Sequence, residues 1–261
     1  MSHQLKNIKF KGHLRFKETN GKYVFLSDGD KHPDEMDKLK QFFRKHHGLY
    51  KFLKYVISPL YFDNFLNKFI ENNVEGKEGC YINLGSGSLS IGENIINVDI
   101  SDYNNVHVVC DVSDLPFVDS SVDVVFILSV LEHIAEPSKT VKEIYRVLKP
   151  GGLVYCEFPF VVGFHAAPYD FNRMTDVGAK ELFRQFNSVD VRVGSGPTSA
   201  LLWIAQEWVA IVLSLGNRYL YRFWLLTVMC LTFPVKYLDV LFNFFPAAKN
   251  IAATFVLVGR K

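Results

Sequence analysis

The stretch Tyr81-Ile-Asn-Leu-Gly-Ser-Gly-Ser-Leu-Ser-Ile-Gly-Glu-Asn-Ile-Ile-Asn-Val-Asp-Ile100 gives the strongest indication of the fold. A short apolar run leads into the turn Gly85-Ser-Gly87, and a second apolar run ends in an acid, Asp99. Glycine lacks Cβ, so the backbone can bend sharply here and approach a ligand closely. An acid at the tip of the next strand can accept hydrogen bonds from both hydroxyls of a ribose. The stretch therefore predicts a nucleoside-binding crevice at the carboxyl edge of a parallel sheet, although a plain loop between two elements fits the same pattern.

Strand-like and helical runs alternate downstream of this turn. A helix over 138–148 is expected to end at Pro150-Gly151-Gly152, and another over 176–186 has Thr175 as its N-cap. The expected strands are 81–84, 96–100, 106–111, 122–129, 153–159, 189–193 and 253–259. This alternation predicts βαβ units and therefore an α/β fold around a parallel sheet.

The N-terminal part has a different pattern. Residues 1–34 are expected to form a small β hairpin, because Asn20-Gly21 is a strong turn signal between two alternating runs. Residues 35–78 are expected to be a basic amphipathic helical segment, with lysines and arginines between apolar residues at helical spacing. We therefore expect a third part over 79–261, which carries an apolar helical insertion over 197–250.

Composition narrows the functional classes. The formal net charge of the 261 residues is only +2, so the overall charge does not favour nucleic acid as a partner. The N-terminus lacks the apolar core of a signal peptide. Four cysteines without metal-ligand spacing are expected to be buried, reduced thiols: Cys80, Cys110, Cys156 and Cys230. These features predict a cytoplasmic protein.

Three further motifs follow in order: Cys110-Asp-Val-Ser-Asp-Leu-Pro-Phe-Val-Asp-Ser-Ser-Val-Asp-Val-Val-Phe126, Leu131-Glu-His-Ile134, and Glu143-Ile-Tyr-Arg-Val-Leu-Lys-Pro-Gly-Gly152. Over roughly residues 80–195 the chain resembles the class I S-adenosylmethionine-dependent methyltransferases. This resemblance implies a Rossmann-like, seven-stranded sheet with an antiparallel last strand. It also implies S-adenosyl-L-methionine as the cofactor.

The resemblance implies a role for each residue that matches the cofactor motif. The loop residues would approach the methionine and ribose, Asp99 would hold the ribose hydroxyls, and Asp111 would accept from the adenine amino group. The full cofactor-binding set is Asn83, Gly85, Ser86, Gly87, Asp99, Ile100, Asp111, Val112 and Ser129. Three features depart from the family pattern: the loop lacks a third glycine, the interval from Gly87 to Asp99 is short, and Asn83 replaces an acid that often contacts the cofactor ammonium.

The N-terminal hairpin resembles the small zinc ribbon that precedes some methyltransferases. The four positions where that family has cysteines are Asn7, Phe10, Phe25 and Asp28. None of these side chains is a thiolate or imidazole, which a tetrahedral zinc site needs, so we expect no metal. An unrelated hairpin is the alternative.

The loop after the 153–159 strand carries the candidate groups for the methyl acceptor. His165 is our first choice for a general base, because imidazole titrates near neutral pH. Asp170 would orient it, and Arg173 would bind an anionic group of the acceptor. His133, just after the 122–129 strand, is the second candidate base. The structural alternative is that Asp170 and Arg173 only fix the loop through a salt bridge.

The insertion over 197–250 is far more apolar than a solvated helical segment. It must bury its surface against itself, a partner subunit or a bilayer. The basic segment Lys38–Val56 fits a bilayer, because cationic amphipathic helices bind anionic membranes. We therefore expect a protein peripheral to the inner face of the cytoplasmic membrane, and a soluble homodimer through the insertion is the rival.

The expected function is O-methylation of a lipophilic or lipid-linked acceptor from S-adenosylmethionine. A surface-glycan precursor is favoured, because a loop of the form Asp-Phe-x-Arg-x-Thr resembles methyltransferases of surface-glycan pathways, and a quinone-like ring is the second choice. The alternatives are a non-catalytic scaffold with this fold and a dimeric soluble small-molecule methyltransferase. Nucleic-acid methylation is disfavoured, because no Asn-Pro-Pro-Tyr motif is present.

Overall fold

The computed structural model describes residues 9–12, 16–19, 21–25, 64–165 and 169–261. Four features of the sequence analysis fall outside these residues: Asn7, Asn20, Asp28 and the basic segment Lys38–Val56.

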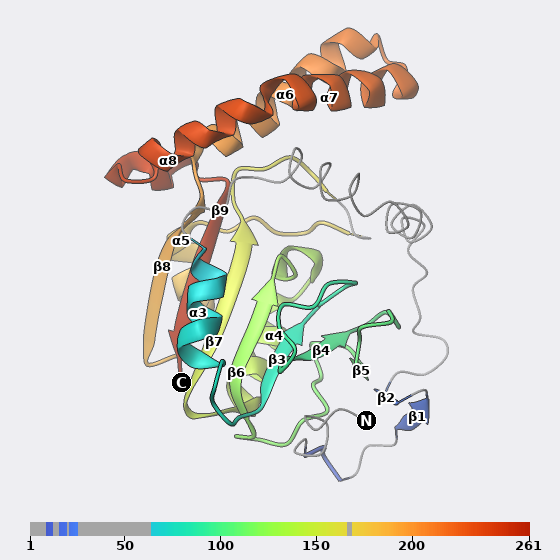
Figure 1. Ribbon diagram of the computed structural model, residues 1–261, viewed down its shortest axis with the longest axis vertical. Helices are drawn as coiled ribbons and strands as arrows, with labels where there is room; N and C mark the ends of the chain where they lie inside the picture. Colours follow the sequence, from blue (N-terminus) through green and yellow to red (C-terminus); the bar gives the residue numbers. More distant parts are fainter. Residues whose placement is uncertain (1–8, 13–15, 20, 26–63, 166–168) are drawn as a thin grey trace.

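A twisted sheet with the strand order β1-β2-β5-β4-β3-β6-β7-β9-β8 forms the centre of the molecule (Figure 1). Its strands are β1 (Lys17–Thr19), β2 (Lys22–Val24), β3 (Tyr81–Leu84), β4 (Ile96–Asp99), β5 (Val108–Val109), β6 (Val122–Leu128), β7 (Leu148–Pro159), β8 (Ser188–Ser195) and β9 (Thr254–Arg260). From β5 to β7 neighbouring strands are parallel, and β9 runs antiparallel between β7 and β8. This order confirms the expected fold class, including the reversed last strand.

The structure corrects two expected strands. β7 begins at Leu148 rather than at residue 153, because Leu148 already pairs with Val122. The Lys149-Pro-Gly-Gly152 segment is therefore part of the strand, with a register shift in the pairing and with Gly151 at φ +79°. β5 spans only Val108–Val109 instead of six residues.

Two of the nine strands found in the described part of the chain come from the N-terminal hairpin. β1 pairs antiparallel with β2, and Gly21 between them lies at φ +75°. β2 then pairs in parallel with β5, where Tyr23 N–H donates to the His107 carbonyl at 3.0 Å. The hairpin therefore extends the main sheet instead of standing apart from it, which accounts for the two strands beyond the expected seven.

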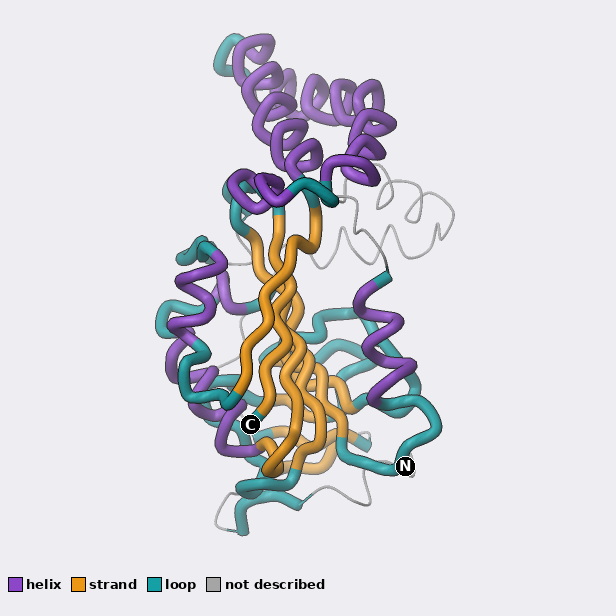
Figure 2. The backbone as a smooth tube through the Cα atoms, turned by 90° about the vertical axis from the view of Figure 1, so that its left-hand side faces the viewer, coloured by secondary structure: helices purple, strands orange, loops and turns teal. Residues whose placement is uncertain are grey.

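Helices cover both faces of this sheet (Figure 2). Helix α3 (Phe65–Asn73) packs on one face, and α4 (Pro137–Val147) and α5 (Asp176–Leu182) lie on the other. Successive side chains of a strand point to opposite faces, so Val125 of β6 faces the core under α4 whereas Phe126 faces the core under α3. Both layers exclude water, which explains why the central strands carry apolar side chains on both faces.

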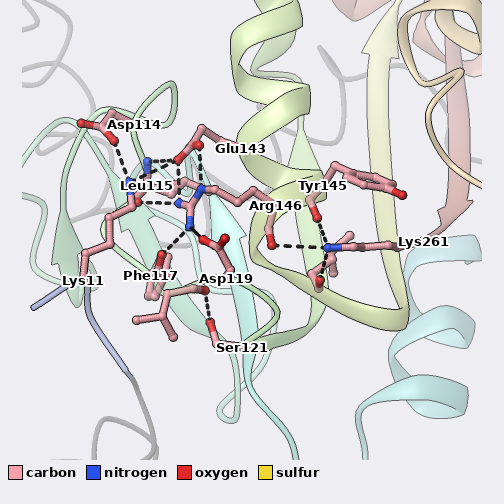
Figure 3. Close-up of polar contacts among 12 residues, drawn as sticks. Lys11, Asp114, Leu115, Phe117, Asp119, Ser121, Glu143, Tyr145, Arg146 and Lys261 are labelled. Atoms are coloured by element: carbon pink, nitrogen blue, oxygen red, sulfur yellow. Dashed lines mark hydrogen bonds and ion pairs between the residues drawn. The ribbon is translucent and has the colours of Figure 1, made fainter.

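The Leu-Pro-Phe and Arg-Val-Leu-Lys-Pro-Gly-Gly motifs meet around one side chain, Arg146 of α4 (Figure 3). Its guanidinium donates to the Leu115 carbonyl at 2.9 Å, to the Phe117 carbonyl at 2.8 Å and to Glu143 Oε2 at 2.7 Å. Burial opposes ionisation of Glu143, but these charge-assisted bonds outweigh it and hold its pKa below the usual value. The two motifs therefore fix the 115–119 segment against α4, directly after the expected adenine-binding residues.

The insertion between β8 and β9 is a helical hairpin, formed by α6 (Pro197–Ser214) and α7 (Arg218–Thr232) and followed by the short α8 (Asp239–Phe242). It projects beyond the carboxyl edge of the sheet (Figures 1 and 2). The buried Asp239 carboxylate fixes its base, because it accepts from the backbone N–H groups of Thr198 and Ser199 in the first turn of α6. The helix thus starts at a defined point and direction.

Candidate active site

The glycine turn after β3 is held in left-handed backbone, with Gly85 at φ +62° and Gly87 at φ +52°. A Cβ on Gly85 would meet Val130 Cγ2 at 2.4 Å, whereas nothing lies within 4 Å of a Cβ on Gly87. The first glycine is therefore required by packing against the segment after β6. The second leaves open space beside the loop, as a bound nucleoside needs.

Asp99, at the end of β4, joins this loop to the sheet. Its Oδ2 accepts from Gly87 N–H at 2.7 Å and its Oδ1 from Ser101 N–H at 2.8 Å, and the residue is 7% exposed. A carboxylate at the end of this strand is the type of group that accepts hydrogen bonds from ribose hydroxyls. The loop and the acid therefore form one preassembled unit.

Asn83 has a structural partner that the sequence did not reveal. Its amide donates to Asn97 Oδ1 at 3.3 Å, and Asn97 in turn donates to the Asn105 carbonyl at 3.0 Å. The Asn105 side chain completes the series by donating to the Gly87 and Leu89 carbonyls, both at 3.2 Å. This series of amide hydrogen bonds connects Asn83 to the backbone of the glycine loop and supports it. The contact of Asn83 with a cofactor ammonium stays a prediction.

The remaining predicted cofactor residues lie at the ends of the neighbouring strands. Ile100 and Asp111 are exposed, and Asp111 Oδ1 accepts from Ser113 N–H at 2.7 Å. Val112 is 8% exposed. Ser129 follows β6 at φ +52°, an uncommon conformation for a residue with a side chain, and its N–H donates to the Glu157 carbonyl at 2.9 Å. The parallel topology therefore brings the predicted set to one edge of the sheet.

Asp170 and Arg173 of the acceptor loop form a bidentate ion pair. Asp170 Oδ2 accepts from Arg173 Nη2 at 2.7 Å and from the His165 backbone N–H at 2.9 Å. The arginine lowers the pKa of Asp170 to about 2. Because Asp170 Oδ2 stands 3.8 Å from His165 Nδ1, it holds the backbone of the loop rather than the imidazole ring. The geometry matches the structural alternative for this pair.

Both candidate bases lie beside a residue that the sequence analysis did not select, Glu132. Its side chain is 1% exposed, and neither carboxylate oxygen has a hydrogen-bond partner among the described residues. Glu132 Oε1 lies 3.7 Å from His165 Nε2 and 3.9 Å from His133 Nε2. This facing carboxylate raises the pKa of His165. The sequence did carry a signal for Glu132: it stands next to His133 in the Leu131-Glu-His-Ile134 motif, directly after a strand.

Helix α6 reaches this loop through Trp203. The indole ring lies 6.2 Å from the His165 ring, and a Cβ on Gly163 would meet Trp203 Nε1 at 2.7 Å. The apolar insertion is therefore in direct contact with the segment that carries the candidate acceptor groups. Phe164, Tyr169 and Phe171 of the same segment are exposed aromatic side chains, suited to an apolar acceptor.

The contrast between the two glycines gives a test of the loop. We expect Gly85→Ala to lower the free energy of unfolding by about 3 kcal/mol, from left-handed strain and overpacking against Val130, and Gly87→Ala by about 1 kcal/mol from strain alone. Urea unfolding followed by circular dichroism measures both. In a double-mutant cycle, Val130→Ala should recover part of the Gly85→Ala loss. Equal losses at the two glycines would contradict the packing role of Gly85.

Residues 79–156 match a protein-family model described as a methyltransferase domain. A stretch of 49 residues, 18% of this chain and 20% of the relative, is 53% identical to a demethylmenaquinone methyltransferase of Clavibacter sepedonicus. A stretch of 98 residues, 37% of this chain and 35% of the relative, is 35% identical to the demethylmenaquinone methyltransferase of Paenarthrobacter aurescens. The matches thus span 20% and 35% of the length of these curated relatives.

A solved structure with a similar fold is phosphoethanolamine N-methyltransferase 2 of Haemonchus contortus in complex with S-adenosyl-L-methionine. The two chains share 17% sequence identity at a TM-score of 0.47, over 80% of this chain and 56% of that one.

Proposed function

We propose, from the premise that residues 79–156 form a class I S-adenosylmethionine-dependent methyltransferase domain, that this chain methylates a lipophilic or lipid-linked acceptor at a membrane surface. One observation carries the acceptor class: the apolar hairpin contacts, through Trp203, the loop that bears His165. The predicted cofactor residues lie at the same edge of the sheet.

The residues at this edge fit the cofactor. Open space lies beside Gly87, the Asp99 carboxylate stands next to that loop at the end of β4, and Asp111 is exposed for an adenine amino group. When bound, S-adenosylmethionine supplies an activated methyl group on a sulfonium. The chain then mainly has to align the acceptor with that methyl group and exclude water.

The surface of the hairpin supports the membrane part. Gln206 donates to Thr232 Oγ1 at 2.7 Å and Tyr221 donates to Glu207, so these polar groups are satisfied between the two helices. The outward surface is apolar, with Leu215 89% and Leu231 75% exposed. Such an arrangement, with polar groups inside and apolar groups outside, suits a lipid environment better than water.

Length and composition agree with this proposal. Within the described residues, one helical segment, Arg218–Phe242, has 25 residues and contains an 18-residue window with a mean hydropathy of 1.7, of which 17% is buried, so by length and composition it could cross a membrane. The helix carries Arg218 and Arg222 in its first two turns. We propose that the hairpin lies in the interface with these guanidinium groups at the lipid phosphates, on the inner face of the cytoplasmic membrane. A dimer that buries the same surface is the competing arrangement.

The names of the matched relatives favour a quinone-like ring as the first acceptor to test, ahead of a lipid-linked glycan precursor. We propose methylation on oxygen. A hydroxyl acceptor must lose its proton at or before transfer, and the cluster Glu132, His133 and His165 provides titratable groups at the acceptor loop.

Transfer of labelled methyl groups tests this function. The purified full chain is incubated with S-adenosylmethionine labelled on the methyl group and with either the lipid or the aqueous extract of a bacterial cell, and products are identified by mass spectrometry. We expect label in the lipid extract only. Label confined to the aqueous extract would indicate a soluble acceptor, and absence of cofactor binding in calorimetry would indicate a scaffold.

A further inference from the structure

Three potential metal-ligand atoms lie close together, on the side chains of Glu132, His133 and His165. The carboxylate oxygen of Glu132 and one nitrogen from each imidazole all lie within 4.8 Å of one another. Glu132 follows β6 and His165 follows β7, so the cluster lies at the carboxyl edge beside the predicted cofactor residues. It is distinct from the N-terminal hairpin on which the expectation of no metal was based.

Hydrogen bonds orient both histidine rings. His133 Nδ1 lies 2.6 Å from the Tyr169 carbonyl oxygen, which only accepts, so this Nδ1 carries the proton and the Nε2 of the neutral ring presents a lone pair. His165 Nδ1 lies between the Gly163 carbonyl oxygen at 3.2 Å and the donor Arg173 Nη2 at 3.3 Å. The Nε2 atoms of both rings lie close to Glu132 Oε1, at 3.9 Å for His133 and 3.7 Å for His165.

The buried carboxylate of Glu132 calls for a positive charge between it and the two imidazoles. Glu132 is almost completely buried, and neither of its oxygens has a hydrogen-bond donor among the described residues. A buried, unpaired carboxylate costs several kcal/mol. Histidines that ligate a metal typically donate their other nitrogen to a backbone carbonyl, and a backbone carbonyl lies within hydrogen-bond distance of Nδ1 in both rings here.

We propose that Glu132, His133 and His165 bind one divalent transition-metal ion through the carboxylate and the two Nε2 atoms. Two histidines and one carboxylate form a known ligand set for zinc and for non-haem iron, which leaves further coordination positions open. Bonds of about 2.1 Å would bring the ligand atoms to about 3.4 Å from one another, so each side chain has to move by less than about 1 Å. The histidine side chains are 17% and 35% exposed, so the open positions can reach the acceptor.

This site gives the proposed methylation a specific acceptor chemistry, and in that respect it rests on the proposed function. An acceptor hydroxyl bound to the ion loses its proton to water more readily, because the ion stabilises the oxyanion. The oxyanion then forms the new O–C bond while the C–S bond of the sulfonium breaks, which leaves a neutral thioether. The acceptor class is therefore a hydroxyl whose oxygen can approach a metal, such as a phenol or a vicinal diol.

Metal binding can be measured without cofactor or acceptor. The full chain is treated with a chelator, and Zn²⁺ and Mn²⁺ are titrated separately in a calorimeter. Co²⁺ is added to record its visible absorption. We expect one ion per chain, with a Co²⁺ spectrum that shows nitrogen and oxygen ligands. Glu132→Gln should weaken Zn²⁺ binding by at least about 100-fold. Glu136→Gln, an exposed acid four residues further on, is the matched control and should leave it unchanged.

Two results would overturn the site. The first is that the wild-type chain binds no ion, which would mean that a protonated His165 pairs with Glu132 instead. The second is equal affinity for the ion in wild type and Glu132→Gln. His133→Asn and His165→Asn test the same ligand set if Glu132→Gln does not fold, as judged by circular dichroism. Metal binding without methyl transfer would refute the proposed function and leave the site standing. Full methyl transfer by a metal-free chain would leave the proposed function standing and refute the role of the ion in activating the acceptor.

Discussion

Asp99→Asn is expected to raise the dissociation constant for S-adenosylhomocysteine by about 100-fold. In the proposed complex the carboxylate accepts hydrogen bonds from the ribose hydroxyls. A hydrogen bond to a charged group contributes about 1.5–3 kcal/mol to the free energy of binding. The amide keeps one acceptor oxygen and replaces the other by a donor, which opposes the N–H group of Gly87 or Ser101. Calorimetric titration of the purified chain gives the constant directly.

Asp102→Asn is the matched control for this change. Asp102 lies three residues further on, is exposed and pairs with Lys22 on the hairpin, so the same substitution there should leave cofactor affinity unchanged. Thermal unfolding without ligand separates a damaged loop from a lost contact. If Asp99→Asn bound the product within about threefold of wild type, the proposed ribose contact would be wrong.

The second large effect concerns the membrane. Four outward-facing side chains of the hairpin, changed together, should reduce partition into anionic lipid vesicles by close to 1000-fold. The variant is Trp208→Gln, Leu215→Gln, Phe223→Gln and Leu231→Gln, at side chains that are 64%, 89%, 59% and 75% exposed. Partial burial of each in lipid contributes about 1 kcal/mol, or about 4 kcal/mol in total. Co-sedimentation with vesicles of phosphatidylglycerol and phosphatidylcholine measures the partition.

Exposed positions tolerate polar residues, so the fourfold variant should keep its fold and its affinity for S-adenosylhomocysteine. Val177→Gln, an exposed apolar residue on α5 that is 68% accessible, serves as the control and should still bind vesicles. The membrane proposal would be wrong if the wild-type chain stayed in the supernatant and sedimented as a dimer in the analytical ultracentrifuge. That result would mean that a second copy of the chain covers this surface.

The sequence predicted the sheet well where local patterns decide it. The Gly85-Ser-Gly87 turn, the run of β6 and the Thr175 cap, whose hydroxyl accepts from Gly178 N–H, all follow from short-range chemistry. The fold class was predicted from the methyltransferase-like motifs, which follow one another along the chain in the order that the family has. The start of β7 was missed because Pro150 and Gly151 are typical helix-ending residues, whereas Leu148 before them already pairs with Val122 of β6 and the regular pairing resumes at Leu153.

The candidate site was predictable only in part, because contacts between distant segments decide it. His165 and His133 were selected one at a time, but no local pattern indicated that both rings would face the carboxylate of Glu132. The bidentate bond between Asp170 and Arg173 was not predicted to be the main interaction of Asp170 for a similar reason: the Asp170 carboxylate is next to both His165 and Arg173, and only the fold shows which contact is shorter. Trp203 lies 38 residues from His165 in the sequence, so its contact required the fold.

The N-terminal hairpin also bears on self-association. Without it, β5 would be an outer strand with free backbone groups, a template on which another chain could add. β2 occupies that position, and the new outer strand β1 is short and carries the exposed charges of Lys17 and Glu18. At the opposite border, β8 presents Asp190 and Arg192, paired with each other. Both borders of the sheet, as the described residues form it, therefore oppose strand-to-strand aggregation, so the protein can reach a high local concentration without forming amyloid-like ladders through them.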